Sequence, residues 1–367
     1  MRIAANYMQS FIANIFKREG FSQAESSVIA ATLIDADLRG ISSHGVQRLE
    51  MYTQKIAAGK VVPGSHWHIL QETKTSVLID AQRTSGQLVA VFTLQQLIQK
   101  AHKNGIAIGV VRNATHFGAA GYYARMAANA GLVGISATNT NPLLVPPHAR
   151  VPFLGSNPFA FAFPTTTEPF VFDAATSTVS LGKIEVLLKN KKKVPGEWAI
   201  DAHGKIEKDP QAILAELSQE KRSGGILPLG GKDEANGNYK GFGNALVIEC
   251  LTALLAQGSF SADLGNGNYD ISHFFLVFDP ALFGELTLLE KNLESMLARI
   301  RALQQNEAAP GLVPGDKENQ NYLKNLTAGI VIDDTTYAEI NKIAAKLGLP
   351  SLAITEKREE DGLNDKL

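Results

Sequence analysis

The chain has 367 residues, 45% of them hydrophobic and 19% charged, and its formal net charge at pH 7 is −1. These values are typical of a globular protein with two or three domains, and they exclude a strongly basic nucleic-acid-binding protein or a membrane-surface protein. No apolar run is long enough to span a bilayer, and charged residues interrupt the first twenty positions, so no secretory signal is predicted. The single cysteine, Cys250, lies in an apolar run, and we expect a buried thiol in a cytoplasmic protein.

The first part of the chain is predicted to be helical. Apolar side chains recur at helical spacing between residues 1 and 20 and indicate an amphipathic helix. Ser22 and Glu25 form a capping box that starts a second helix, which we expect to end at Arg39. A third helix is expected to begin near Val46.

The segment between the second and third helices, ISSHGVQRLEMY, contains a histidine and an arginine four residues apart. His44 can transfer a proton near neutral pH, and Arg48 can bind a carboxylate through two parallel hydrogen bonds. Both project to the same side if the third helix begins early enough. From the spacing alone, a solvated helix start in which neither residue has a special role is the simpler interpretation.

The centre of the chain is predicted to be a strand–helix–strand unit that follows a linker, a short strand and a helix (61–75, 76–79 and 88–102). Its first strand is expected at 106–111, its helix at 118–130 and its second strand at 132–137. The first strand breaks at Asn113, and His116 lies in the break. A helix start offers free backbone donors and a positive dipole end, which favour an anionic ligand and lower the pKa of a histidine.

Two later segments have the composition of a phosphate or ribose site. After strands at 159–163 and 170–172, the polar turn DAATS (173–177) presents amides and hydroxyls, although a plain strand-end turn is the simpler interpretation. The glycine-rich segment 227–243 contains Lys232 and Lys240, without the Walker spacing. We interpret the basic run at 189–193 as a solvated loop rather than a phosphate contact.

The C-terminal part alternates helices and strands. An apolar helix at 243–256 is expected to be central, so that its Glu249 needs a partner. We interpret His273, at the start of a strand, as structural rather than catalytic. The remaining predictions are a strand at 274–278, a helix at 285–303, a linker at 304–319, a strand at 328–332 and a helix at 335–347.

Several common motifs are absent from the sequence. No GxGxxG follows a strand, no cysteine–histidine cluster has zinc spacing, and no GxSxG is present. An ordinary Rossmann site, a zinc centre and a serine hydrolase are therefore not supported, and we expect no metal. Composition and spacing predict an α/β protein with a polar, glycine-rich cleft that contains histidine.

A set of ordered segments extends this prediction. They read DLRGISSHGVQRLEMY, HFGAAGYYARMAANAG, TNTNPLLVPP, LGSNPFAFAFP, DAATSTVSLGKI, LPLGG followed by YKGFG, ISHFFLVFDPALFG and VPGDKE. In this order the chain resembles the malate/L-lactate dehydrogenase family, the type-two group distinct from Rossmann lactate dehydrogenases. That group also contains ureidoglycolate, sulfolactate and diketogulonate dehydrogenases and imino-acid reductases. The resemblance covers roughly residues 14–350.

The resemblance implies a multi-domain α/β (α+β) fold. A helical N-terminal domain, residues 1–70, is completed by helices of residues 320–367, and residues 71–319 form a non-Rossmann α/β region that binds cofactor and substrate. Residues 356–367 are expected to be a mobile tail. The resemblance also implies a homodimer with its active site near domain and subunit contacts.

The implied activity is NAD(P)-dependent hydride transfer between nicotinamide and C2 of a small 2-hydroxy or 2-oxo acid of the malate or lactate type. NAD is the expected cofactor, with NADP as the alternative. His44 and Ser43 match the catalytic Ser-His-Gly motif, Arg48 matches the carboxylate-binding arginine, and His116 matches a second active-site histidine. The positions that match cofactor contacts are Asn139, Asp173, Ala175, Thr176, Ser177, Tyr239, Lys240, Pro314, Gly315 and Asp316.

The sequence leaves some alternatives open. Either His44 or His116 can be the base; we favour His44 as a proton relay through Ser43, with His116 contacting the substrate. Ureidoglycolate dehydrogenase is the alternative activity, and a cofactor-binding relative without catalysis is the alternative class. In the second case His148–Arg150, which replace a common Gly-Gly pair, would block the substrate. Lys183 disfavours the imino-acid reductases.

Overall fold

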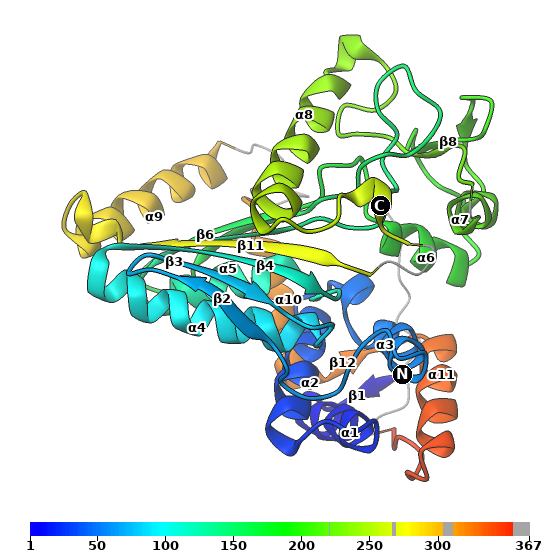
Figure 1. Ribbon diagram of the computed structural model, residues 1–367, viewed down its shortest axis with the longest axis horizontal. Helices are drawn as coiled ribbons and strands as arrows, with labels where there is room; N and C mark the ends of the chain where they lie inside the picture. The colour runs from blue at the N-terminus through cyan, green and yellow to red at the C-terminus, as the bar shows by residue number, and fades with distance from the viewer. Residues whose placement is uncertain (220, 266–268, 304–310, 355–367) are drawn as a thin grey trace. The chain divides into compact units, whose positions relative to one another are not determined.

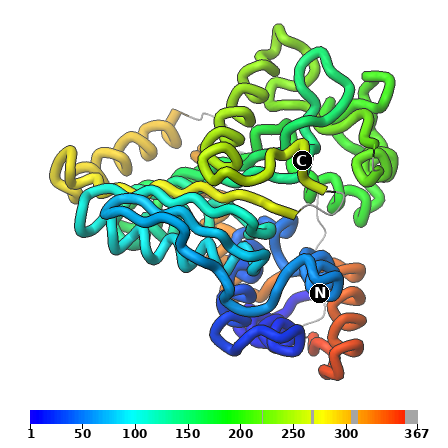
Figure 2. The backbone as a smooth tube through the Cα atoms, in the orientation of Figure 1, coloured from blue at the N-terminus to red at the C-terminus, as the bar shows by residue number. Residues whose placement is uncertain are grey.

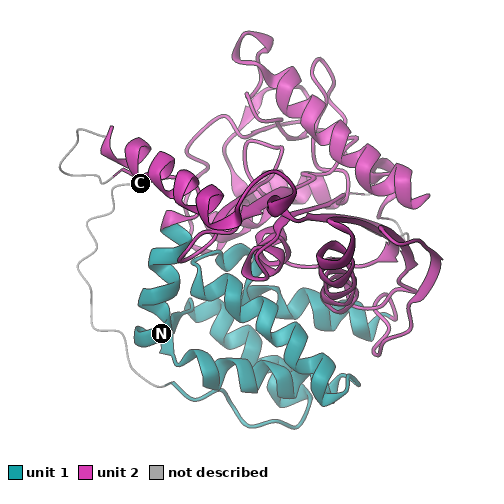
Figure 3. Ribbon diagram, turned by 90° about the vertical axis from the view of Figure 1, so that its left-hand side faces the viewer, with its two compact units in different colours: residues 1–58, 317–367 teal, residues 59–316 magenta. Residues whose placement is uncertain are grey.

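The computed structural model describes residues 1–219, 221–265, 269–303 and 311–354, and it has a mixed α/β fold (Figure 1). The chain divides into two compact units, residues 1–58 with 317–367 and residues 59–316 (Figure 3). The predicted tail at 356–367 and residues 304–310 of the predicted linker lie outside the described residues. The linker ends earlier than predicted, because residues 316–319 are helical. No helix in the described ranges is both long and apolar enough to cross a membrane.

The first unit is mainly helical. Its capping box forms as predicted: the Ser22 hydroxyl accepts from the Glu25 amide, and the Glu25 carboxylate accepts from the Ser22 amide. A short antiparallel pair, β1 (Arg2–Ile3) with β12 (Ile330–Val331), joins the two ends of the unit. The helices are α1 (Ala5–Arg18), α2 (Gln23–Leu38), α3 (Leu49–Ala57), α10 (Asp316–Ala328) and α11 (Asp334–Lys346).

The second unit is built on a seven-stranded sheet in the order β2-β3-β4-β11-β5-β6-β7. β3 and β4 are parallel, and the other neighbouring pairs are antiparallel. β11, far along the chain, lies between β4 and β5 (Figure 2). The strands are β2 (His68–Glu72), β3 (Ser76–Asp80), β4 (Ile106–Ala114), β5 (Val133–Thr138), β6 (Phe159–Phe163), β7 (Phe170–Ala174) and β11 (Ile271–Phe278).

Helices cover both faces of this sheet, as the alternation of its side chains requires. On one face α4 (Gly86–Asn104) and α5 (Ala120–Asn129) pack against buried residues such as Val111 and Phe275. On the other face α8 (Asn238–Glu249) packs its Ile248 against Phe274. The ends of β4 and β5 therefore project from a rigid, two-sided core.

A smaller three-stranded sheet lies in the same unit, in the order β10-β8-β9. Its strands are β8 (Ala199–Ile200), β9 (Ile206–Glu207) and β10 (Gly225–Ile226), and it is accompanied by α6 (Leu181–Lys189) and α7 (Pro210–Ser218). The sequence did not predict α6. The lysines that follow α6 are exposed, which agrees with a solvated loop. α9 (Leu286–Ala302) completes the unit and extends away from the sheet (Figure 1).

The third helix begins near Val46, as predicted, because a 3-10 turn at Val46–Arg48 runs directly into α3 at Leu49. Three other expectations were wrong. The predicted linker at 61–75 contains β2, whose five side chains are all exposed and give no burial pattern. The predicted central helix is amphipathic: it contains a π turn (Cys250–Leu254) and continues to residue 256, and its outer face, Leu246, Val247, Cys250 and Leu254, is exposed. Cys250 is therefore not a buried thiol, because it lies on the side of α8 that faces away from the sheet.

Candidate functional site

In the first unit, the candidate catalytic segment forms two short 3-10 turns, Ser42–His44 and Val46–Arg48, with Gly45 between them. The buried carboxylate of Asp37, on α2, accepts a hydrogen bond from the Val46 amide at 2.8 Å. A Cβ atom on Gly45 would lie 1.9 Å from Oδ1 of Asp37. Only glycine allows the segment to lie this close to Asp37, and burial raises the pKa of that carboxyl to about 7.

The segment brings Ser43, His44 and Arg48 together. The Ser43 hydroxyl lies 2.9 Å from Nδ1 of His44, and Nε of Arg48 donates to the Ser43 carbonyl oxygen at 2.7 Å. Burial, and then the charge of Arg48, lower the pKa of His44 to about 4. His44 is therefore neutral at pH 7 and able to accept a proton, with a hydroxyl beside it and a guanidinium fixed next to it.

The contact between Gly45 and Asp37 leads to a stability prediction. Gly45→Ala is expected to lower the free energy of unfolding by about 3 kcal/mol, because the methyl group must displace a buried carboxylate. Urea denaturation measures the change. The control is Gly243→Ala, where an added Cβ meets no atom within 4 Å. Equal stability of the two variants would contradict the close approach.

In the second unit, His116 lies between β4 and α5 and is half-buried. Its Nδ1 accepts a hydrogen bond from the amide of Gly118, at 3.3 Å. Gly118 has a φ of +89°, and an added Cβ there would meet nothing within 4 Å. Both neighbours of His116, Thr115 and Phe117, are buried. His116 is thus more exposed than Thr115 and Phe117 on either side of it. It lies close to the start of α5, as the sequence predicted.

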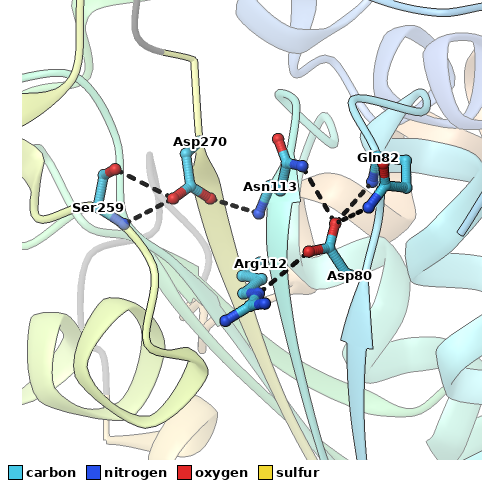
Figure 4. A network of polar contacts seen from close by, with 6 residues as sticks. All are labelled: Asp80, Gln82, Arg112, Asn113, Ser259 and Asp270. Carbon is cyan, nitrogen blue, oxygen red and sulfur yellow. Dashed lines mark hydrogen bonds and ion pairs between the residues drawn. The ribbon is translucent and has the colours of Figure 1, made fainter. Parts of the chain in front are cut away.

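A polar network fixes the end of β4, three residues before His116 (Figure 4). Asn113 is held in the left-handed region, with a φ of +52°. Its backbone amide donates to the Asp270 carboxylate, and its side-chain amide donates to Asp80 at 3.1 Å. Arg112 donates to the other oxygen of Asp80, also at 3.1 Å, and Ser259 donates to Asp270 through its amide and hydroxyl. Two carboxylates thus stabilise a backbone conformation that asparagine tolerates.

The DAATS segment (173–177) begins in the last two residues of β7 and continues beyond the strand. Asp173 is exposed, and its carboxylate accepts a hydrogen bond from the Gly121 amide in the first turn of α5, at 2.6 Å. Ala175 is half-buried, whereas Thr176 and Ser177 are buried. The Thr176 and Ser177 hydroxyls donate to backbone carbonyls within the protein. The backbone of Thr176 is also used within the protein, since its amide donates to the Ser156 carbonyl oxygen and its carbonyl oxygen accepts from the Leu229 amide. Asp173 is therefore the exposed polar side chain of this segment.

Two other candidate segments lie beside this turn. The Leu229 amide donates to the Thr176 carbonyl oxygen at 2.9 Å, and Gly241 on α8 approaches Leu229 so closely that a Cβ would lie 2.3 Å from its carbonyl oxygen. This brings the exposed Tyr239 and Lys240, in the first turn of α8, close to the DAATS turn.

The turn Pro314–Asp316 lies against β7. Gly315 has a φ of +92°, and an added Cβ there would lie 2.9 Å from the Val171 carbonyl oxygen. Arg301 on α9 binds the Asp316 carboxylate through two hydrogen bonds, of 2.6 and 2.8 Å, and this ion pair lowers the pKa of Asp316. The ion pair holds the turn in place.

Asn139 has different surroundings. It is fully buried, accepts from the Ser272 amide and donates to the Ser259 carbonyl oxygen. Its amide group also lies 3.5 Å from Glu249, which accepts stronger hydrogen bonds from Asn157 and Ser261. Glu249 therefore has the partners that its burial was predicted to require. The Asn139 side chain contributes to this internal network rather than to the surface of the turn.

Three polar side chains of this region are exposed: the carboxylate of Asp173, the phenol of Tyr239 and the ammonium of Lys240. Together they can accept from hydroxyl groups and bind an anion. The departures from the family pattern are also exposed: His148–Arg150 lie at the surface, and Nε2 of His148 is 3.8 Å from the Glu234 carboxylate.

Comparison with known proteins places these features in a family. The family model described as malate/L-lactate dehydrogenase matches residues 3–341. The chain belongs to the malate/L-lactate dehydrogenase family. It is therefore a 2-hydroxy acid dehydrogenase, and enzymes of this family depend on a nicotinamide cofactor.

Individual members of the malate/L-lactate dehydrogenase family match over nearly the whole chain. A malate dehydrogenase of Pyrococcus abyssi is 34% identical, over 96% of this chain and 97% of the relative. The ureidoglycolate dehydrogenase (NAD(+)) of Escherichia coli K12 is 28% identical, over 92% of this chain and 94% of the relative. The crystal structure of malate dehydrogenase from Entamoeba histolytica has a TM-score of 0.92 at 28% identity, and covers 95% of this chain and 99% of that one.

Several residues that support the candidate site were not singled out from the sequence. Asp37 lies under Gly45, Asp80 and Asp270 hold Asn113, and Arg301 binds Asp316. Isolated charged residues in helices or at strand ends give no signal of their own. A signal existed only for their partners: the Ser-His-Gly motif, Asn113 and the Pro-Gly-Asp turn. The predicted strand break at Asn113 was wrong, because β4 continues to Ala114 with a register shift against β11 at this point.

Proposed function

We propose that this dehydrogenase transfers hydride between NAD and C2 of a small 2-hydroxy acid of the malate or lactate type. The observation that carries the proposal is the arrangement of Ser43, His44 and Arg48. It combines a neutral histidine, a hydroxyl in contact with it and a guanidinium that is fixed by the Ser43 carbonyl oxygen. These are the groups that oxidation of a hydroxy acid requires: a proton acceptor and a carboxylate ligand.

We assign one role to each residue. Arg48 binds the substrate carboxylate and so orients the C2 hydrogen. In the oxidative direction His44 accepts the hydroxyl proton through Ser43, and His116 donates a hydrogen bond to the developing carbonyl oxygen. The alternative assignment exchanges the two histidines. The contact between the Ser43 hydroxyl and Nδ1 of His44 favours the first assignment, because it gives the substrate proton a path to the ring.

For the cofactor we propose NAD, with NADP as the alternative. The proposed contacts are Asn139, Asp173, Ala175, Thr176, Ser177, Tyr239, Lys240, Pro314, Gly315 and Asp316. The bound cofactor supplies the hydride acceptor, and the protein supplies orientation and charge. The exposed Asp173 and Lys240 support ribose and phosphate binding, whereas Asn139 and Asp316 are better suited to hold the surrounding backbone. The NAD(+) in the name of the ureidoglycolate relative supports NAD.

Turnover tests the proposed substrate class. Loss of nicotinamide absorbance is followed with NADH and with NADPH against oxaloacetate, pyruvate and other 2-oxo acids, and oxidation of ureidoglycolate is measured in parallel. We expect reduction of oxaloacetate or pyruvate. Turnover of ureidoglycolate alone would favour the alternative that the Escherichia coli relative supports. Cofactor binding without turnover of any acid would favour the non-catalytic relative.

We further propose a cytoplasmic homodimer that forms through the outer face of α8, as defined above. The support is exposure: Leu246 is 47%, Val247 56% and Leu254 55% exposed, and apolar area of this kind favours a protein contact. Wild type is expected to sediment at twice 39.5 kDa. Val247→Asp combined with Leu254→Asp is expected to sediment as a monomer. Leu70→Asp, at a similarly exposed apolar residue of β2, is the control, and an unchanged mass in the double variant would exclude this surface.

A further inference from the structure

We infer that His273 is a positioning residue for His116; the inference rests on the role proposed above for His116. His273 lies on β11 and is fully buried. It is separated from His116 by more than one hundred and fifty residues of sequence, but β11 pairs with β4, the strand that leads to His116. The role assigned to His273 is to hold the main chain on both sides of His116.

On the N-terminal side of His116, His273 holds the backbone by a hydrogen bond. Its Nε2 donates to the carbonyl oxygen of Thr115 at 3.1 Å. The Thr115 hydroxyl accepts from the Gly86 amide at 2.9 Å, so the residue is held from two elements. Gly86 itself approaches the backbone of Thr115 and His116 so closely that a Cβ would lie 2.1 Å from the Thr115 carbonyl oxygen.

On the C-terminal side, the same ring packs against the next residue. The centroids of the His273 and Phe117 rings are 4.5 Å apart, at an interplanar angle of 34°. Tyr123 stacks on Phe117 at 4.7 Å, and its hydroxyl donates to the Phe117 carbonyl oxygen. One buried imidazole thus contacts both neighbours of the half-buried His116.

His273 stays uncharged, and this distinguishes a residue that positions His116 from one that transfers a proton. Because Nε2 carries the donated hydrogen, Nδ1 of the neutral ring is an acceptor, and it has no hydrogen-bond partner in the described part of the chain. Protonation would bury an unpaired charge, and burial lowers the pKa of His273 to about 3. The ring therefore stays neutral throughout the range in which a dehydrogenase works, and it positions His116 without exchanging the substrate proton.

Two substitutions separate the hydrogen bond from the ring contact. His273→Gln keeps a donor that can reach the Thr115 carbonyl oxygen, and His273→Phe keeps an aromatic ring on Phe117. We expect His273→Phe to lower kcat about ten- to one-hundred-fold, with the KM for the cofactor unchanged within about two-fold, because loss of the donor lets the turn move. His273→Gln is expected to restore kcat to within about three-fold of wild type.

A second readout does not depend on activity. Labelled imidazole carbons are followed by NMR, with the His116 resonance assigned from His116→Gln, and we expect this resonance to shift in His273→Phe. Phe274→Leu is the control, since Phe274 is also buried but packs in a separate hydrophobic cluster on the opposite face of β11.

The outcomes are distinguishable. A shifted resonance with a lower kcat supports the inference. A shifted resonance with an unchanged kcat upholds the positioning and overturns the catalytic role of His116 instead. An unmoved resonance in His273→Phe, or an equal shift and loss of kcat in Phe274→Leu, overturns the inference, because the effect would then follow general destabilisation of the sheet.

Discussion

His44→Gln is expected to lower kcat by about 10²- to 10⁴-fold, the usual contribution of a positioned acid–base group. Glutamine retains a polar contact with Ser43 but cannot accept the substrate proton. In wild type, oxidation requires neutral His44, so the oxidation rate is expected to persist as pH falls and to decline only near the lowered pKa of about 4. Steady-state rates measured from neutral pH down to the limit of stability test both statements.

The exposed His102 on α4 provides a matched control. His102→Gln is expected to retain wild-type rates over the whole pH range. If His44→Gln remains active while His116→Gln loses turnover, the base is His116, and the two proposed roles exchange.

Arg48→Ala is expected to lower kcat/KM for a 2-oxo acid by about 10²- to 10³-fold, because it removes a charge-assisted contact to the carboxylate. Most of the loss is expected as a higher KM. Arg48→Lys should recover only part of it, since an ammonium cannot form two parallel hydrogen bonds. Initial rates over a range of substrate concentrations separate KM from kcat.

The same substitution has a second measurable effect. Arg48 contributes to the lowered pKa of His44, so Arg48→Ala should move the acid limb of the oxidation rate to higher pH. Arg18→Ala, at the exposed end of α1, is the control and should change neither quantity. An unchanged KM in Arg48→Ala would exclude Arg48 as the carboxylate ligand.

Much of the fold followed from local sequence patterns. The capping box at Ser22 and the strands predicted at 132–137 and 159–163 each depend on a few adjacent residues, and the structure confirmed them. β2 gave no such signal, because all five of its side chains are exposed. α8 was predicted to be a central helix, because its residues are mostly apolar. Composition alone does not indicate that only one side of the helix packs on the sheet.

The candidate site was predictable only in part, for a similar reason. The Ser-His-Gly segment and His116 are short local motifs. The residues that fix their conformation come from elsewhere in the chain: Asp270 reaches Asn113, and His273 reaches Thr115, across more than 150 residues. Such partners depend on which strands are neighbours in the sheet, and a single sequence does not give the position of β11 between β4 and β5.

The buried Asp37 beneath Gly45 has a consequence for the proton balance of unfolding. Its folded pKa of about 7 lies above the ordinary 3.8, so between these values it releases a proton when the first unit unfolds. His44 and His273, with folded pKa values of about 4 and about 3, take up protons on unfolding below pH 6.5. Stability from the histidines is therefore lost as pH falls below 6.5, whereas stability from Asp37 is lost as pH rises towards 7. Near pH 5 the proton that Asp37 releases and the proton that His44 takes up largely cancel when the first unit unfolds. In the second unit, the proton taken up by His273 on unfolding is not cancelled in this way. Acid should therefore destabilise the sheet unit before the helical one.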